Sequence, residues 1–175
     1  MKSQQFSKMF LVVLIAALLF AACSKDSNNP VDPGTDPTTS GASVKLNGGG
    51  FNNKQVNLSL GLSAYIINDN ATYVQFIGKV DNDSLYLVFV FEGKQTGTFQ
   101  WSGSTIETYV LHISQTGSFV YANMTEGSTT VSSYGEVGSK INGNFSGKLI
   151  ETSAQQVELT VEGTFSVVRG PDENQ

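Results

Sequence analysis

Residues 156–169 read QVELTVEGTFSVVR, and this stretch decides the fold class. Its apolar side chains recur at alternate positions: Val157, Leu159, Val161, Phe165 and Val167. The positions between them hold mainly Glu, Thr and Ser. A period of two places the apolar side chains on one face of a β-strand. The stretch therefore predicts a strand with one buried face and one solvated face.

Further strands are predicted along the chain, because the same alternation recurs between Gly-, Asn- and Ser-rich turns. They cover residues 56–63, 72–80, 84–91, 97–101, 108–114, 118–124 and 139–150. No stretch of this region has the 3.6-residue period of an amphipathic helix. We therefore expect an all-β domain over residues 44–169, an antiparallel β-sandwich of about 8–10 strands. The alternative is a closed, calycin-like β-barrel.

The stretch Leu85–Phe91, LYLVFVF, is apolar on both of its faces. One face of each sheet in a two-layer sandwich is normally wet. This strand therefore needs additional cover, from the far side of a barrel, a folded-over segment or a partner protein.

A turn is predicted at Asp81–Asp83, because Asp and Asn side chains favour turn conformations. If all three residues form the loop, Phe76 lies opposite Val88 in the hairpin. A register one residue different would exchange the two faces of the strand.

A Gly-x-Phe pattern begins at Gly97, Gly117, Gly143 and Gly163. In a hairpin that turns near Ala154, one register sets Phe145 over Gly163 and Phe165 over Gly143. Each ring then covers the gap left by the glycine across from it. We interpret the pattern as architecture rather than as a binding signature.

The N-terminus has the layout of a secretory signal peptide over residues 1–22. Lys2 and Lys8 precede the apolar run FLVVLIAALLFAAC, which ends at Cys23, the only cysteine of the chain. Ala-Ala-Cys resembles a bacterial lipobox, although Phe20 stands where a lipobox usually has Leu. The resemblance implies cleavage before Cys23 and attachment of lipid to its thiol. Lipidation would also account for a lone cysteine in an exported protein.

Residues 23–43 are rich in Pro, Asp, Asn, Ser and Thr, which predicts a disordered tether behind the lipid anchor. Residues 170–175 form a polar tail. Removal of Lys2 and Lys8 with the signal peptide changes the formal net charge from −5 to −7. A mildly acidic exported chain is not expected to bind nucleic acid.

Few residues could support catalysis. His112 is the only histidine, so a catalytic triad would rest on it alone and a histidine-built zinc site lacks partners. No nucleophile elbow or phosphate-binding glycine loop occurs. We predict a protein that is not an enzyme, with no metal and no cofactor. A hydrolase that uses only carboxylates, as glycosidases do, is an alternative.

Two aromatic residues are candidates for ligand binding. Trp101 precedes Ser102–Thr105, a run of small residues, and Tyr134 is predicted in the loop before the last hairpin. Aromatic rings at the rim of a β domain often form platforms for sugars or proteins. Core or rim packing of Trp101 is the competing interpretation.

Residues 133–147, SYGEVGSKINGNFSG, with the closing VEGTFSVVR, resemble the C-terminal part of uncharacterised envelope lipoproteins of Bacteroidetes-type bacteria. The resemblance implies lipid anchorage in the outer membrane, facing the periplasm or the cell surface. We expect a non-catalytic binding or structural module with a glycan or an envelope protein as partner. A barrel-type carrier of a small apolar ligand is the first alternative, and the carboxylate-dependent hydrolase is the second.

Overall fold

The computed structural model describes residues 39–101, 108–122, 126–153 and 155–174. The signal peptide, Cys23, most of the tether and the run Ser102–Thr105 lie outside the described residues. Strands dominate the described part, and they form two six-stranded sheets. The prediction of an all-β sandwich is confirmed.

The first sheet has the order β2-β1-β11-β10-β9-β6. Its strands are β1 (Gly41–Gly48), β2 (Phe51–Leu58), β6 (Gly97–Gln100), β9 (Glu126–Tyr134), β10 (Lys140–Ile150) and β11 (Glu158–Val168). The second sheet has the order β12-β3-β4-β5-β7-β8. Its strands are β3 (Leu60–Ile66), β4 (Ala71–Val80), β5 (Asp83–Glu92), β7 (Tyr109–Ser114), β8 (Gly117–Tyr121) and β12 (Asp172–Glu173).

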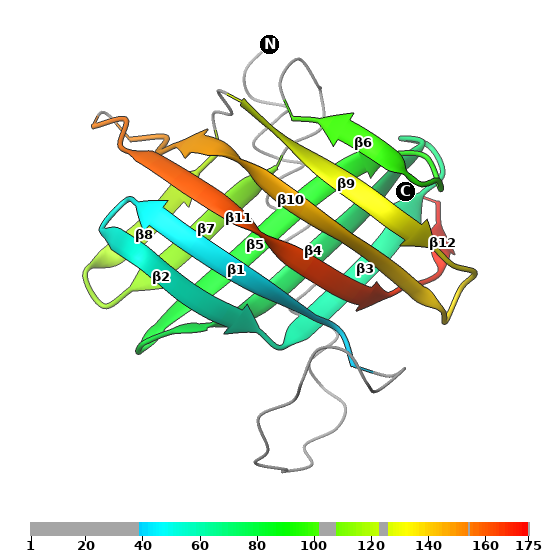
Figure 1. Ribbon diagram of the computed structural model, residues 1–175, viewed down its shortest axis with the longest axis horizontal. Helices are drawn as coiled ribbons and strands as arrows, with labels where there is room; N and C mark the ends of the chain where they lie inside the picture. The colour runs from blue at the N-terminus through cyan, green and yellow to red at the C-terminus, as the bar shows by residue number, and fades with distance from the viewer. Residues whose placement is uncertain (1–38, 102–107, 123–125, 154, 175) are drawn as a thin grey trace. The chain divides into compact units, whose positions relative to one another are not determined.

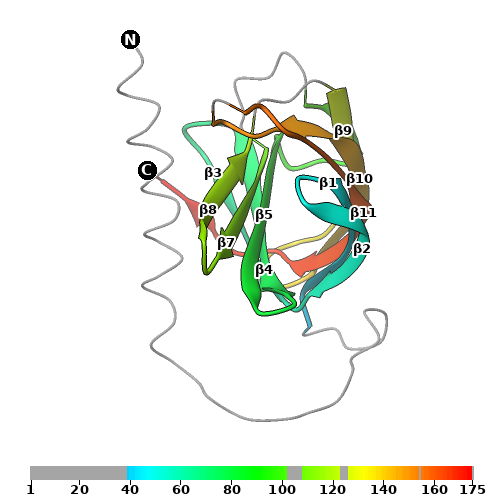
Figure 2. The same ribbon diagram turned by 90° about the vertical axis from the view of Figure 1, so that its left-hand side faces the viewer.

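The two sheets lie face to face, as the side view shows (Figure 2). Seen through both layers, the strands of one sheet cross those of the other instead of running along them (Figure 1). In such packing a strand can pass from one sheet to the other at a corner. The chain does so at Ser59, between β2 of the first sheet and β3 of the second. The single strand predicted over residues 56–63 is therefore two strands in different sheets.

The interior is filled by aromatic rings. Phe76, Phe89, Phe145 and Phe165 are at most 5% exposed. The centroids of Phe89 and Phe165 are 4.8 Å apart, and those of Phe89 and Phe145 are 5.6 Å apart. The described strands form two separate six-stranded sheets that do not close into a barrel. The alternative of a closed, calycin-like barrel is therefore wrong.

The β10–β11 hairpin has the predicted register, with Phe145 opposite Gly163 and Phe165 opposite Gly143. A Cβ atom added to Gly163 would lie 2.8 Å from Cζ of Phe145, and one added to Gly143 would lie 2.7 Å from the Phe165 ring. Each ring thus occupies the space that a side chain on the facing residue would need. The architectural interpretation of this hairpin is confirmed.

The predicted register of the β4–β5 hairpin is wrong by one residue. Val80 pairs with Asp83, so the turn holds only Asp81 and Asn82, and Phe76 lies opposite Leu87. Asp81 adopts a left-handed conformation with φ of 56°. Asp tolerates this conformation in tight turns. The shorter turn directs the side chains of Leu85, Leu87, Phe89 and Phe91 into the core.

The outer face of β5 is also covered. Val88 and Val90 are 2% and 7% exposed, and they belong to a second apolar cluster. Tyr109 of β7 lies opposite Val88, and Tyr73 of β4 lies opposite Val90. Large side chains on the flanking strands therefore pack beside the outward valines.

The strands extend beyond the predicted domain limits of 44–169. β1 begins at Gly41, inside the predicted tether, and β12 lies inside the predicted polar tail. Twelve strands in the described residues exceed the predicted 8–10. Besides β1 and β12, the predictions missed β9, whose sequence EGSTTVSSY has little apolar alternation. It buries the hydroxyl of Thr129 instead of a row of apolar side chains.

Candidate functional site

Trp101 lies in the core and is 2% exposed. Its indole nitrogen donates a hydrogen bond of 2.9 Å to the Thr129 hydroxyl. Its ring covers Gly127 and Gly147, where an added Cβ would lie 2.4 Å and 2.3 Å from ring atoms. A ring placed in this way presents no face to a ligand, so the core-packing interpretation applies to Trp101.

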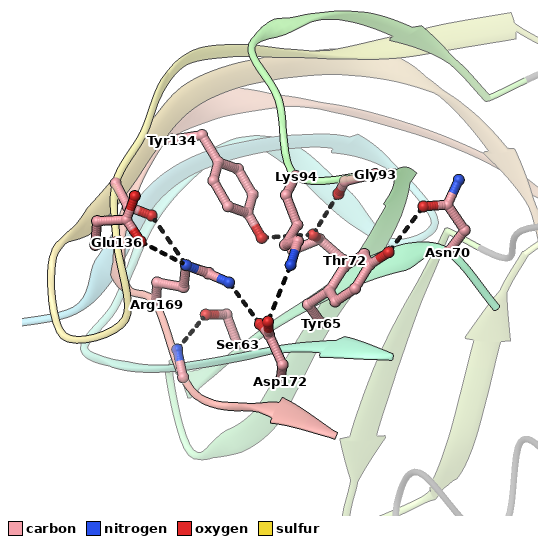
Figure 3. A network of polar contacts seen from close by, with 12 residues as sticks. Ser63, Tyr65, Asn70, Thr72, Gly93, Lys94, Tyr134, Glu136, Arg169 and Asp172 are labelled. Carbon is pink, nitrogen blue, oxygen red and sulfur yellow. Dashed lines mark hydrogen bonds and ion pairs between the residues drawn. The ribbon is translucent and has the colours of Figure 1, made fainter. Parts of the chain in front are cut away.

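Tyr134 is the last residue of β9 and not part of the following loop. Its half-buried ring meets Phe91 edge-on, with the centroids 6.2 Å apart. Its hydroxyl lies 2.8 Å from Oγ1 of Thr72, which itself donates to the carbonyl of Gly93. Tyr134 thus belongs to a polar network that joins both sheets (Figure 3).

The centre of this network is Arg169, directly after β11, with a side chain that is 6% exposed. Its guanidinium lies 5.3 Å from the centre of the Tyr134 ring and forms an ion pair with Asp172. A second contact, of 3.7 Å, reaches Glu136. Lys94 also binds Asp172, at 3.0 Å. We name Lys94, Tyr134, Glu136, Arg169 and Asp172 the C-terminal clamp (Figure 3).

The clamp secures the end of the chain against the edge of β3. Asp172 and Glu173 form the parallel strand β12 beside Tyr65 and Ile66. The amide of Ile67 donates a hydrogen bond of 2.9 Å to the carbonyl of Glu173. This pairing covers backbone groups of β3 that would otherwise form an open edge.

The electrostatics of the clamp agree with a stabilising role. The hydrogen bond from Lys94 lowers the pKa of Asp172, partial burial opposes this shift, and Arg169 adds to it. The Nε atom of Arg169 is buried without a hydrogen-bond partner among the described residues. Because that atom is shielded from solvent and the terminal nitrogens face acids, the guanidinium is not placed to receive an anion.

His112 faces the space between the sheets at another edge. Its Nε2 lies 2.9 Å from a carboxylate oxygen of Asp83. The rings of Phe51 and Phe119 lie beside it, with centroid distances of 5.1 Å and 5.9 Å. In the described part of the chain, no hydroxyl forms a hydrogen bond with His112 in the manner of a catalytic nucleophile. The arrangement is that of a paired histidine in an apolar environment.

Next to Phe119 lies a partly open depression of about 480 Å³. It forms where β8 of the second sheet meets the end of β10 of the first. The amide of Ala122 donates to the carbonyl of Ile150, and the amide of Thr152 donates to that of Val120. We name it the corner depression, and its lining residues are Thr116, Gly117, Ser118, Phe119, Glu151, Ser153 and Gln155.

Glu151 is the unusual member of this lining. It is only 8% exposed, yet within the described residues Nε of Arg169 is the one buried side-chain nitrogen or oxygen without a hydrogen-bond partner, so the Glu151 carboxylate is not buried and unsatisfied. The backbone of Glu151 forms an isolated antiparallel β-bridge with Tyr121. The Tyr121 hydroxyl donates a hydrogen bond to the carbonyl of Gly49. Burial raises the pKa of Tyr121, and the negative charge of Glu151 raises it further. The corner depression therefore places a carboxylate close to the Tyr121 hydroxyl.

The sequence predictions missed both Arg169 and Glu151, although a signal existed for each. Arg169 continues the series of buried positions that includes Val167, and Glu151 continues the series that includes Leu149. In both strands the alternation therefore directs a charged residue inward at the strand's end. Charged residues are rarely buried at such positions unless they are paired.

A metal centre is not indicated by the part of the chain that is described: no three His, Cys, Asp or Glu side chains lie together there as metal ligands would. Within the same residues, no helix is long and apolar enough to cross a membrane. No family model matches the sequence, and no match was found among curated proteins or among solved structures.

Proposed function

We propose that the chain is an exported lipoprotein, held in the outer membrane by lipid on Cys23, whose β-sandwich is a non-catalytic binding module of the envelope. The observation that carries this proposal is the apolar run that ends at the only cysteine of the chain. A diacylated residue would hold the chain firmly, since each buried CH₂ contributes about 0.8 kcal/mol.

The packing of the domain favours a binding module over a carrier of apolar ligands. A carrier needs an internal cavity of several hundred Å³. Here the described interior holds the rings of Phe76, Phe89, Phe145 and Phe165 in mutual contact. An apolar ligand would have to displace them.

The placement of the acids favours a binding module over a hydrolase. Glycosidases need two carboxyl groups on either side of a substrate, roughly 5–9.5 Å apart. Several acids of the described domain instead form surface pairs with lysines: Glu162 with Lys45, Asp81 with Lys54 and Glu126 with Lys148. The corner depression is lined by a single carboxylate.

The test of the anchor is metabolic labelling with a palmitate analogue. We expect the native chain to take up the label, Cys23→Ala to lose it, and Ser24→Ala to keep it as a matched control. The same cells are then treated with an external protease. Digestion of the native domain would place it at the cell surface, and protection would place it in the periplasm. Absence of label on the native chain would refute the proposal.

A further inference from the structure

The outward side of the second sheet is largely apolar. Around the outward valines of β5 it carries half-buried or exposed side chains of Leu60, Leu62, Ile77, Tyr86, Leu111 and Ile113. The outward side of the first sheet instead carries ion pairs such as Lys45 with Glu162. A continuous apolar patch on the surface of a domain marks an interaction site. We name the outward side of β3, β4, β5, β7 and β8 the outer apolar face.

Two charged residues lie on the outward sides of β4 and β5, at opposite ends of the hairpin. Lys79 follows Gln75 by four residues on β4, and Glu92 follows Val88 by four residues on β5. Since Gln75 and Val88 are paired and the strands are antiparallel, the two charges lie equally far on either side of that pair. Within the described residues, neither Lys79 nor Glu92 has an ion-pair partner.

A two-fold axis along the Gln75–Val88 pair would make this face complementary to itself. Such an axis relates identical patches on two copies and, lying across the strands, reverses the strand direction of the second copy. Lys79 of each copy would then lie near Glu92 of the other, so both charges would gain a partner of opposite sign. An axis along the strands would instead bring the two Lys79 side chains to the same end.

The side chains beside the transverse axis also match. Tyr73 would face Ile77 of the second copy, and Val90 would face Tyr86, so each ring would meet an aliphatic side chain. Gln75 lies on the axis itself. Because an amide holds both donors and an acceptor, two copies of Gln75 could exchange two hydrogen bonds.

The size of the face suits a specific dimer. Five strands spaced about 4.8 Å apart, with about seven residues of about 3.3 Å each, cover roughly 24 Å by 23 Å. Two such faces would bury roughly 1,100 Å² together, and a specific interface needs about 1,000 Å². Sheet faces also pack on one another readily, at a spacing of about 10 Å.

We infer that the outer apolar face binds a second copy of this chain, in a two-fold dimer whose axis follows the Gln75–Val88 pair. A membrane fits the face less well, because anionic lipid attracts clusters of basic residues and Lys79 is the one basic residue on the outward sides of these five strands. The inference goes beyond the proposed binding role and does not depend on the lipid anchor.

The first test is cysteine cross-linking of the full chain in a mild detergent, with Cys23→Ala in every variant to remove the only native thiol. A short bismaleimide should join Gln75→Cys chains, because residues on the axis face each other across about 10 Å. It should not join Lys79→Cys chains to one another, because their cysteines would be roughly 26 Å apart. It should join Lys79→Cys to Glu92→Cys in a mixed sample. Thr160→Cys, on the outward side of β11, is the matched control and should not be joined.

The second test is sedimentation equilibrium of the native full chain in a density-matched detergent. We expect a dimer, which Ile77→Lys should weaken about tenfold to a hundredfold and Thr160→Lys should leave unchanged. The fluorescence of Trp101 reports native folding of each variant. Should Ile77→Lys fail to fold, Leu62→Lys supplies the same comparison.

A native chain that sediments as a monomer would overturn the inference. Cross-linking that is equally efficient at residues 75, 79 and 160 would overturn it as well. So would a monomer that binds phosphatidylcholine vesicles through this face, which would appear as binding by the native chain that Ile77→Lys loses. Palmitate labelling is independent of these results, so a failure of the anchor can be told from a failure of the dimer.

Discussion

Replacement of Phe145 by alanine tests whether the paired rings and glycines hold the sandwich together. The Phe145 ring is 2% exposed, contacts Phe89 and Phe165, and covers Gly163. An aromatic side chain buries about 150–250 Å², which at about 25 cal/mol per Å² corresponds to roughly 4–6 kcal/mol. Alanine retains a small part of this, and Phe→Ala changes in cores usually cost about 3–5 kcal/mol. We expect a loss of about 4 kcal/mol in the free energy of unfolding.

The assay is urea unfolding followed by the fluorescence of Trp101, the only tryptophan of the chain and a residue buried in the same core. With a urea dependence of about 2 kcal/mol per M, the midpoint should fall by about 2 M. Phe51→Ala is the matched control: its half-buried ring lies on the edge strand β2, and its removal should cost about 1–2 kcal/mol. A loss below about 1.5 kcal/mol for Phe145→Ala would refute the reasoning.

A second variant tests whether the Phe145 ring or the backbone of β1 is the reason that residue 163 must be glycine. A Cβ at residue 163 would lie 2.8 Å from the Phe145 ring but 2.1 Å from the carbonyl oxygen of Ser43. Because Ser43 belongs to the paired strand β1, removal of the ring leaves that clash in place. Gly163→Ala should therefore destabilise the Phe145→Ala protein as well. Equal stability of the single and double variants would show that the ring alone excludes a side chain.

Three further predictions concern the polar groups. Glu151→Gln should lower the raised pKa of Tyr121 in an absorbance titration, compared with a Tyr121→Phe reference, and an unchanged pKa would contradict the proximity of the two groups. The folded protein favours the neutral form of Tyr121, as its raised pKa shows. The contribution of neutral Tyr121 to the free energy of unfolding is therefore complete below pH 10 and declines as the pH rises through the folded-state pKa. Asp172→Asn should speed hydrogen exchange at the Ile67 amide while core amides stay protected. Since the pKa of Asp172 is lowered, exchange at the Ile67 amide of the native chain should also become faster as the pH falls through that pKa and Asp172 is protonated. An exchange rate at Ile67 that changes neither with Asp172→Asn nor with acid would show that the ion pairs of Asp172 do not hold β12 in place. Trp101→Phe should cost about 1–3 kcal/mol in thermal unfolding, because it leaves a buried threonine hydroxyl without its donor, and no change would show that this hydrogen bond is dispensable.

Most strands and the β10–β11 register could be predicted, because their patterns are local. In β11 the period-two alternation is nearly unbroken, and the Gly-x-Phe pairs permit a register that fills both gaps. β1 was not predicted because it follows the polar tether directly. β9 was not predicted because its inward face carries Thr129 beside Val131, and a polar threonine on the buried face interrupts the apolar alternation that identifies a strand.

The candidate sites were harder to predict, because each depends on contacts between distant segments. Trp101 is buried only because Gly127 and Gly147 leave room for its ring. The corner depression brings the turn before β8 to the end of β10. In the β4–β5 hairpin, a loop one residue shorter than predicted moved every cross-strand pair.

The sequence by itself determined that the domain is built of strands, which faces of those strands are apolar, and where the Gly-x-Phe pairs cover one another. These properties follow from the alternation of neighbouring side chains. The lipid anchor at Cys23 stays a prediction from the sequence. Only the tertiary structure decided the passage of the chain between the sheets at Ser59, the clamp at Arg169 and the low exposure of Glu151. The physical reason is that burial and ion pairing depend on which segments meet in space, and local alternation carries no information on that choice.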